Sequence, residues 1–85
     1  MIERVAVIDF ETTGITPGRE GRATEIGIVI LEGGVIVDRF QSLMNAGVSV
    51  PPMIEQLTGI SNAMLRSAPT AASVMCDAAN FVGRT

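Results

Sequence analysis

The chain has 85 residues, of which 47% are hydrophobic and 18% are charged, and its formal net charge is −3 at pH 7. This length allows one small domain at most, and the high hydrophobic content excludes a disordered tail. Because the chain has no overall positive charge, we expect any contact with nucleic acid to be local or to depend on a metal ion.

The first predicted element is a strand from about Val5 to Glu11. Its residues are apolar or β-branched on both faces, which is typical of a central strand buried on both sides. The strand ends within the sequence VIDFETTG, where two carboxylates, Asp9 and Glu11, are followed by two threonines and a glycine.

Two further strands are predicted next. The segment from Gly14 to Arg22 contains Thr-Pro-Gly and mixed charge, which indicates a turn or loop. A strand from about Ala23 to Glu32 follows, and the pair Gly33-Gly34 favours a tight hairpin into a third strand, from about Val35 to Leu43. The first half of the chain is therefore predicted to form a three-stranded antiparallel meander.

Two short helical turns are predicted after the meander. Pro51-Pro52 ends the extended segment and favours a turn from Met53 to Leu57, which closes near Gly59. Ser61 is a candidate N-cap for a second turn, from Asn62 to Arg66.

A longer helix is predicted from about Ala71 to Val82. Thr70 is its candidate N-cap and Gly83 its expected stop. Apolar residues at helical spacing form one face, which we expect to pack on the sheet: Val74, Ala78, Phe81 and Val82.

No membrane span or signal peptide is predicted. Charged residues, including Asp9, Glu25 and Glu32, interrupt the apolar runs well before about 18 residues. The single cysteine, Cys76, has no internal disulfide partner, which favours a reducing cytoplasm.

The end of the first strand carries the residues with the clearest chemical potential. Asp9 and Glu11 are two positions apart, so on a strand they share a face at about 6.6 Å along the chain. Such a carboxylate pair suits Mg²⁺ or Mn²⁺, and Asp9 is the natural bridge if two ions bind. Thr12, Thr13 and Gly14 form a turn whose backbone N–H groups a phosphate or sugar can approach. The simpler alternative is ordinary turn chemistry after a buried strand.

Three other charged residues leave two interpretations open. Glu25, on the second strand, either supports a metal site or is a solvated or capped strand position. Arg19 and Arg22 either contact the nucleic-acid backbone or only solvate a loop.

The ordered set VIDFETTG, TEIG and VPPMIEQLTGIS resembles the N-terminal part of the DEDD 3′-5′ exonucleases of the DnaQ-like group, which includes the proofreading epsilon subunit of bacterial DNA polymerase III. The resemblance spans nearly the whole chain, and the D-x-E-T-T-G motif is matched in full. It implies that Asp9 and Glu11 are the catalytic residues and metal ligands. The implied substrate-binding residues are Thr12, Thr13, Gly14, Leu57 and Thr58.

The resemblance also implies the fold and the reaction. The fold is α/β and ribonuclease H-like, present here in part, as a three-stranded antiparallel meander with short helical turns and one packed helix. The reaction is hydrolysis of nucleotides from a single-stranded 3′ end of DNA, with RNA as an alternative, by a two-metal site holding Mg²⁺ or Mn²⁺. A DNA polymerase subunit is a candidate partner.

The family completes its site with residues that are not found here. These are a second Asp in an H-N-x-x-F-D-like motif and a third Asp accompanied by a His or Tyr general base, whereas the chain has no His and no Tyr. Asp38 and Asp77 stand in other contexts, on the hairpin strand and in the last helix. We therefore expect residues 1–85 to be the N-terminal part of a single, incomplete exonuclease domain that is inactive alone, and the open edge of its first strand to make the fragment self-associate.

Two other function classes are compatible with part of the pattern. A sugar-kinase or actin-like nucleotide-binding domain also begins with an Asp at a strand end, but its following turn is glycine-rich, and Phe10 and Glu11 disfavour it. The other is a non-catalytic nucleic-acid-binding or protein-interaction module with the same fold. The pair Asp9 and Glu11 disfavours it, because two buried carboxylates without a metal repel each other.

Overall fold

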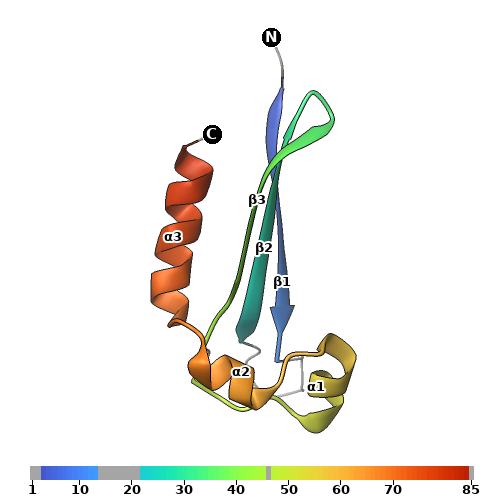
Figure 1. The fold of residues 1–85 in the computed structure, drawn as a ribbon, viewed down its shortest axis with the longest axis vertical. Coiled ribbons are helices and arrows are strands. Elements are labelled where there is room, and N and C mark those ends of the chain that lie inside the picture. Colours follow the sequence, from blue (N-terminus) through green and yellow to red (C-terminus); the bar gives the residue numbers. More distant parts are fainter. Residues whose placement is uncertain (1–2, 14–21, 46, 85) are drawn as a thin grey trace.

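A computed structural model describes residues 3–13, 22–45 and 47–84. Three strands precede three helices along the chain (Figure 1). The elements are β1 (Arg4–Thr12), β2 (Ala23–Glu32), β3 (Val35–Leu43), α1 (Pro52–Thr58), α2 (Asn62–Ser67) and α3 (Ala71–Gly83). The predicted order of elements is confirmed, and most of the predicted loop before β2 lies outside the described residues.

The three strands form one antiparallel sheet in the order β1-β2-β3. β2 and β3 are joined by Gly33 and Gly34, whose φ angles are 59° and 83°. Positive φ at both positions suits a two-residue hairpin turn, and glycine adopts it without a steric penalty. The predicted meander and hairpin are therefore correct.

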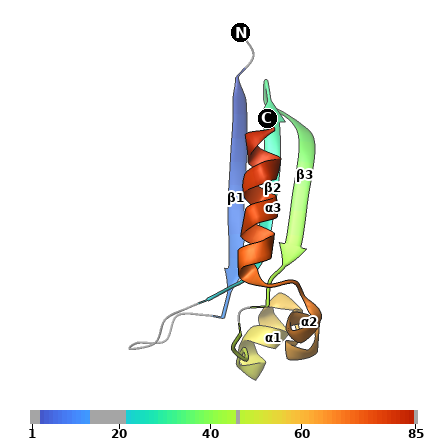
Figure 2. The same cartoon turned by 90° about the vertical axis from the view of Figure 1, so that its left-hand side faces the viewer.

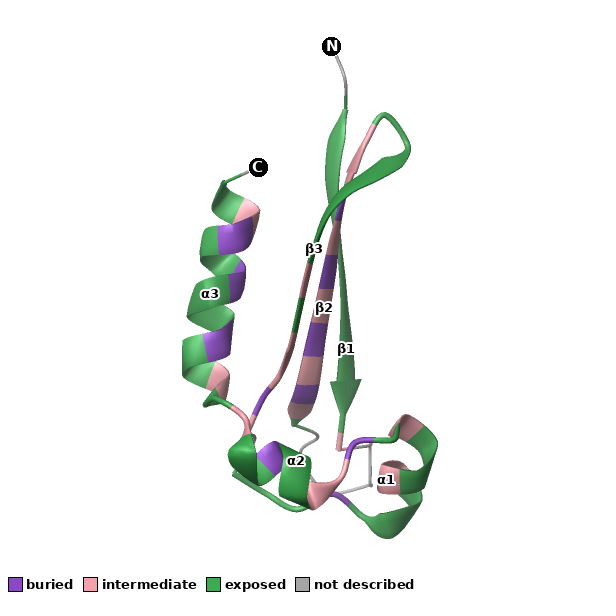
Figure 3. Ribbon diagram, viewed as in Figure 1, coloured by how far each residue is buried: buried purple, intermediate pink, exposed green. Residues whose placement is uncertain are grey.

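The main hydrophobic core lies between β2 and α3. Alternate residues of β2 are buried, and α3 covers that face of the sheet (Figure 2). The buried bands on β2 and α3 are visible in Figure 3. Phe40 of β3 also joins this core, with its ring centroid 5.4 Å from that of Phe81. The buried members of the core are Ile26, Ile28, Ile30, Met44, Val74, Ala78 and Phe81.

β1 departs from the sequence-based expectation of a strand buried on both faces. Every residue of β1 is exposed, and within the described part of the chain its hydrogen-bonded neighbour in the sheet is β2 alone. Val7 and Ile8, which point to opposite faces, are 46% and 49% exposed. The expected burial is wrong here because no described element covers β1 on either face as α3 covers β2.

The helices after the sheet begin and end close to where they were predicted. α1 ends at Gly59, which has a φ of 76° and donates its N–H to the Glu55 carbonyl. The Ser61 hydroxyl accepts from the Met64 N–H at the start of α2, 3.1 Å away. A second small core, made of Val50, Ile60 and Leu65, lies in this region.

α3 begins as predicted and ends slightly later. The Thr70 hydroxyl accepts from the Ser73 N–H at 3.2 Å, as expected of an N-cap. The helix ends at Gly83, the expected stop, but without a left-handed glycine, because Gly83 is not among the described glycines with positive φ. Arg84 after it is in right-handed backbone and donates its N–H to the Asn80 and Phe81 carbonyls. None of the helices in the described residues is long and apolar enough to span a membrane.

Candidate functional site

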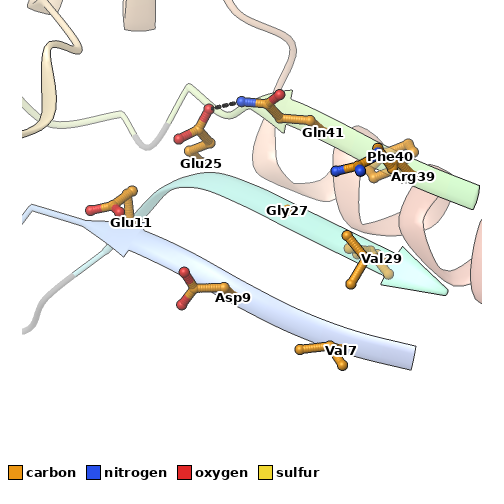
Figure 4. Close-up of a pocket in the computed structure, with 10 residues that line it drawn as sticks. Val7, Asp9, Glu11, Glu25, Gly27, Val29, Arg39, Phe40 and Gln41 are labelled. Carbon is orange, nitrogen blue, oxygen red and sulfur yellow. Dashed lines mark hydrogen bonds between the residues drawn. The ribbon is translucent and has the colours of Figure 1, made fainter. Parts of the chain in front are cut away.

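Asp9 and Glu11 lie on the face of the sheet opposite α3. On β1, the residues Ile8 and Phe10 line a hollow together with α3, so the alternating positions Asp9 and Glu11 point away from that helix. The strand register places Asp9 opposite Gly27 and Glu11 opposite Glu25 on β2. The predicted sharing of one face by the two carboxylates is therefore seen (Figure 4).

Two of the three carboxylates on this face, Asp9 and Glu25, accept a hydrogen bond. An Asp9 oxygen accepts from the Phe10 backbone N–H at 3.0 Å. An oxygen of Glu25 accepts from the Gln41 side-chain amide at 2.6 Å (Figure 4). Because Asp9 and Glu11 are exposed and Glu25 is held by Gln41, the first two are the carboxylates most open to a ligand.

A hollow of ≈ 300 Å³ runs across the sheet beside these carboxylates. Its floor is β2, with Gly27 near the middle, and its walls come from β1 and β3 (Figure 4). The lining residues on the same face as Asp9 and Glu11 are Val7, Glu25, Gly27, Val29, Arg39 and Gln41.

The donor chemistry of Asp9 and Glu11 fits a hard divalent cation such as Mg²⁺ or Mn²⁺, which binds carboxylate oxygens. Among the residues that the structure describes, no cluster of three or more His, Cys, Asp or Glu side chains is placed to hold a metal ion. Asp38 pairs with Ile30 on the face towards α3, and Asp77 lies within α3, so neither adds to the pair. Among the described residues, this face thus brings together Asp9 and Glu11, with Glu25 beside them held by Gln41.

The threonines that follow the pair are less open than expected. The register between β1 and β2 shifts between Glu11 and Thr12, which indicates a bulge at the end of the strand. The Thr13 N–H donates to the Arg22 carbonyl at 2.8 Å, and the Arg22 N–H donates to the Thr13 hydroxyl at 3.0 Å. The expectation of an exposed Thr13 N–H is therefore wrong, while Gly14 and Arg19 lie outside the described residues.

Leu57 and Thr58 lie at the end of α1, beyond the carboxyl end of β1 in both views (Figures 1 and 2). The Leu57 side chain is 80% exposed and available for contact. The Thr58 hydroxyl instead donates to the Ile54 carbonyl at 2.8 Å and accepts from the Ile60 N–H at 3.2 Å. These two bonds give Thr58 a role in closing α1.

Sequence reasoning missed the contribution of β3 to this face. Arg39 and Gln41 lie opposite Val29 and Gly27, two strands away from Asp9. Plain alternation from the Gly33-Gly34 hairpin would place Arg39 opposite Ile28, on the face towards α3. The register shift between Ile30 and Leu31 moves Arg39 and Gln41 to the face of Asp9, and no sequence motif signalled that shift.

Comparisons with known proteins agree with this arrangement. Residues 6–85 match the model of a family described as Exonuclease, of the RNase T type. The chain is 45% identical over 65 residues to the 3′-5′ exonuclease DinG of Bacillus subtilis, covering 76% of this chain and 7% of that protein. It is 39% identical over 77 residues to DNA polymerase III subunit epsilon of Aquifex aeolicus, covering 91% of this chain and 38% of that protein. The chain thus spans 38% or less of these two relatives.

Solved structures give the fold. The nuclease domain of 3′hExo, a DEDDh family member bound to rAMP, superposes with a TM-score of 0.86 at 24% identity, over 96% of this chain and 44% of that one. A full-length 3′-exonuclease gives a TM-score of 0.85 at 23% identity, over 94% of this chain and 29% of that one. The predicted ribonuclease H-like exonuclease fold, present in part, is confirmed.

Proposed function

Because the chain belongs to the exonuclease family, we propose that it forms part of a 3′-5′ exonuclease that removes nucleotides from the single-stranded 3′ end of DNA. Relatives at 39% identity or more include a 3′-5′ exonuclease, a putative bifunctional exonuclease/endonuclease and a DNA polymerase III subunit. The observation that carries the proposal is the position of Asp9 and Glu11, side by side on one exposed face next to an open hollow.

Asp9 and Glu11 are the proposed catalytic residues and metal ligands, for Mg²⁺ or Mn²⁺. Such ions, when bound in a two-metal site, activate a water molecule and stabilise the leaving 3′ oxygen. The chain contributes two negative charges on a hydrogen-bonded strand, where their separation is fixed before any ligand arrives. This placement lowers the entropy lost when the reacting groups are brought together.

The proposed contacts with the terminal nucleotide come from the end of β1 and from α1. Leu57 offers an exposed apolar side chain on which a base can rest. The other proposed contacts are Thr12, Thr13, Gly14 and Thr58. Since the Thr58 hydroxyl is engaged within α1, its proposed contact is through its methyl group or backbone.

Residues 1–85 are proposed to be the N-terminal part of a single exonuclease domain and to be inactive alone. The support is the coverage of 44% of a solved nuclease domain and the lack of any His or Tyr to serve as general base. Reading the coding DNA past Thr85 tests this. We expect the reading frame to continue and to encode a strand, then the motif His-Asn-x-x-Phe-Asp and later a His-x₄-Asp pair. A stop codon directly after Thr85 would contradict the proposal of an incomplete domain.

DNA is the proposed substrate because the relatives include a DNA polymerase III subunit. RNA is the alternative, since one structural neighbour is described as recognising the 3′ end of a histone mRNA stem-loop. A polymerase subunit is the proposed protein partner, because one relative is a subunit of DNA polymerase III. The cytoplasm is the proposed location.

The isolated chain is also proposed to self-associate through β1. Within the described part of the chain, β1 is an edge strand with a sheet neighbour on one side, and its exposed apolar side chains favour pairing with a second chain. Light scattering at micromolar concentration is expected to give a mass above that of one 8.9 kDa chain, and a clean monomer would contradict the proposal.

Calorimetric titration of the complete protein with Mn²⁺ tests the metal assignment. Asp9→Ala is expected to remove most of the binding heat, since it deletes one of the two ligands. Asp38→Ala is the matched control, because Asp38 is also an exposed strand residue whose carboxylate accepts from the next backbone N–H, at 2.9 Å, but it lies on the other face. Equal heat from Asp9→Ala and wild type would favour the non-catalytic binding module instead.

A further inference from the structure

Gly27 occupies the middle of β2 without a structural reason among the described residues. Its φ is not among the positive values of the described glycines, and the register on both sides of it is regular. A Cβ added at Gly27 meets no described atom within 4 Å. Because glycine weakens a strand interior, its presence there points to a site where another molecule approaches the backbone closely.

The open space above Gly27 is lined by three carboxylates, Asp9, Glu11 and Glu25, and by one cation, so a phosphate is held there only beside that cation. Asp9 borders it on β1, and Gln41, which lies opposite Gly27, borders it on β3. Arg39 is the only cation among the residues that line this hollow. Within the described part of the chain, the only salt bridge joins Arg4 and Glu32, so the Arg39 guanidinium is left for an external anion.

The position of Arg39 indicates which part of a substrate it meets. Asp9 and Arg39 are two strands and two residues apart, which corresponds to about 12 Å in an antiparallel sheet. A phosphate at Arg39 therefore belongs to a nucleotide upstream of the one whose phosphodiester lies at Asp9. Gln41 lies between them and holds Glu25 through its 2.6 Å hydrogen bond, which keeps that carboxylate in place beside the hollow.

We propose that Gly27, Arg39 and Gln41 form the path along which the sugar-phosphate backbone of a single strand crosses the sheet to reach Asp9 and Glu11. This inference rests on the exonuclease function proposed above and adds the upstream part of its binding site. Because Gly27 has no side chain, the sugar-phosphate backbone can approach β2 closely at this position. Arg39 binds a backbone phosphate by a charge-assisted hydrogen bond. Neither residue touches the reacting atoms, so both are positioning residues.

Steady-state kinetics of the complete protein on oligothymidylate tests the path. Arg39→Gln is expected to raise KM about tenfold and to change kcat little. A tenfold rise in KM corresponds to the loss of about one hydrogen bond to a charged group. The substitution also lowers the slope of log KM against log salt by roughly 0.7, the value for one phosphate contact on a single strand. Arg84→Gln is the matched control, because Arg84 follows α3 on the other face of the sheet and its loss leaves the slope unchanged.

A steric variant tests the room above Gly27. Gly27→Val places a branched side chain in the hollow and is expected to raise KM at least as much as Arg39→Gln, while its salt slope stays close to wild type. Gly27→Ala is expected to melt at or above the wild-type temperature, since the added Cβ meets nothing and alanine orders more readily than glycine.

The outcomes separate the path from the underlying function. If the wild-type protein does not shorten the oligonucleotide, the exonuclease function fails and the path fails with it. If wild type is active but Arg39→Gln and Gly27→Val keep its KM and salt slope, the path alone is wrong. A lower melting temperature for Gly27→Ala would show that another protein segment packs on this face, which also overturns the path.

Discussion

β1 and β2 are neighbouring strands of similar apolar character, but β2 is buried on one face and β1 is exposed. On β2, four alternate residues are buried under α3, namely Thr24, Ile26, Ile28 and Ile30. On β1 every residue is exposed, including apolar ones at 39% to 49%. The strand that stabilises the described fold is therefore β2, whereas β1 carries the carboxylates and is held by backbone pairing to β2 on one edge. An apolar strand sequence indicates that the strand can be buried, but it does not identify the element that covers the strand.

The strongest test of this contrast compares Ile28→Ala with Ile8→Ala in the 85-residue chain. The two isoleucines are cross-strand partners on the same face, but Ile28 is 2% exposed and Ile8 is 49% exposed. Ile28→Ala is expected to lower the free energy of unfolding by about 2 to 5 kcal/mol, through lost burial and a cavity. Ile8→Ala is expected to cost less than about 1 kcal/mol, because about half of the Ile8 surface stays in water in the folded chain.

Urea denaturation followed by circular dichroism measures both values under the same conditions. Equal losses for the two variants would show that β1 is covered in solution, either by a second copy of the chain or by a segment outside the described residues. Repeating the pair at several protein concentrations separates these two, because only self-association depends on concentration.

A smaller effect is expected at the turn that joins β2 to β3. Gly34→Ala forces a side chain into left-handed backbone at a φ of 83° and is expected to cost about 1 to 2 kcal/mol. The added Cβ has open space around it, so the cost is conformational and not a clash. Hydrogen exchange is expected to quicken at β3 more than at the paired residues of β1 and β2. Unchanged stability would mean that the turn adopts another conformation in solution.

The smallest expected effect concerns the ion pair that joins the start of β1 to the end of β2. Arg4 and Glu32 approach within 2.9 Å, but their side chains are 47% and 31% exposed. Arg4→Gln is therefore expected to lower stability by about 0.5 kcal/mol or less, and high salt is expected to erase the difference. A loss above about 1 kcal/mol that persists in high salt would show that β1 depends on this pair more than on its backbone bonds.

The sequence was a good guide wherever local chemistry decides the structure. Gly33-Gly34, Ser61 and Thr70 set a hairpin and two helix starts through backbone conformation and capping, which depend on a few neighbouring residues. The shared face of Asp9 and Glu11 follows from the two-residue repeat of a strand in the same way.

The sequence was a poor guide wherever distant residues decide the outcome. The exposure of β1 depends on which elements cover it, and the engagement of Thr13 by Arg22 depends on how two strand ends meet. The place of Arg39 on the candidate site required the register of all three strands.

The central claim is that Asp9 and Glu11 mark a metal-dependent site that shortens single strands from the 3′ end. The most direct measurement is a time course of the complete protein on 5′-labelled single-stranded DNA with Mg²⁺, comparing wild type with Asp9→Asn and Asp38→Asn. The account predicts a ladder of stepwise shortened products for wild type and Asp38→Asn. The ladder is expected to form at least about 100-fold more slowly with Asp9→Asn, and no ladder is expected in EDTA. An undiminished ladder from Asp9→Asn, or no shortening by wild type, would contradict it.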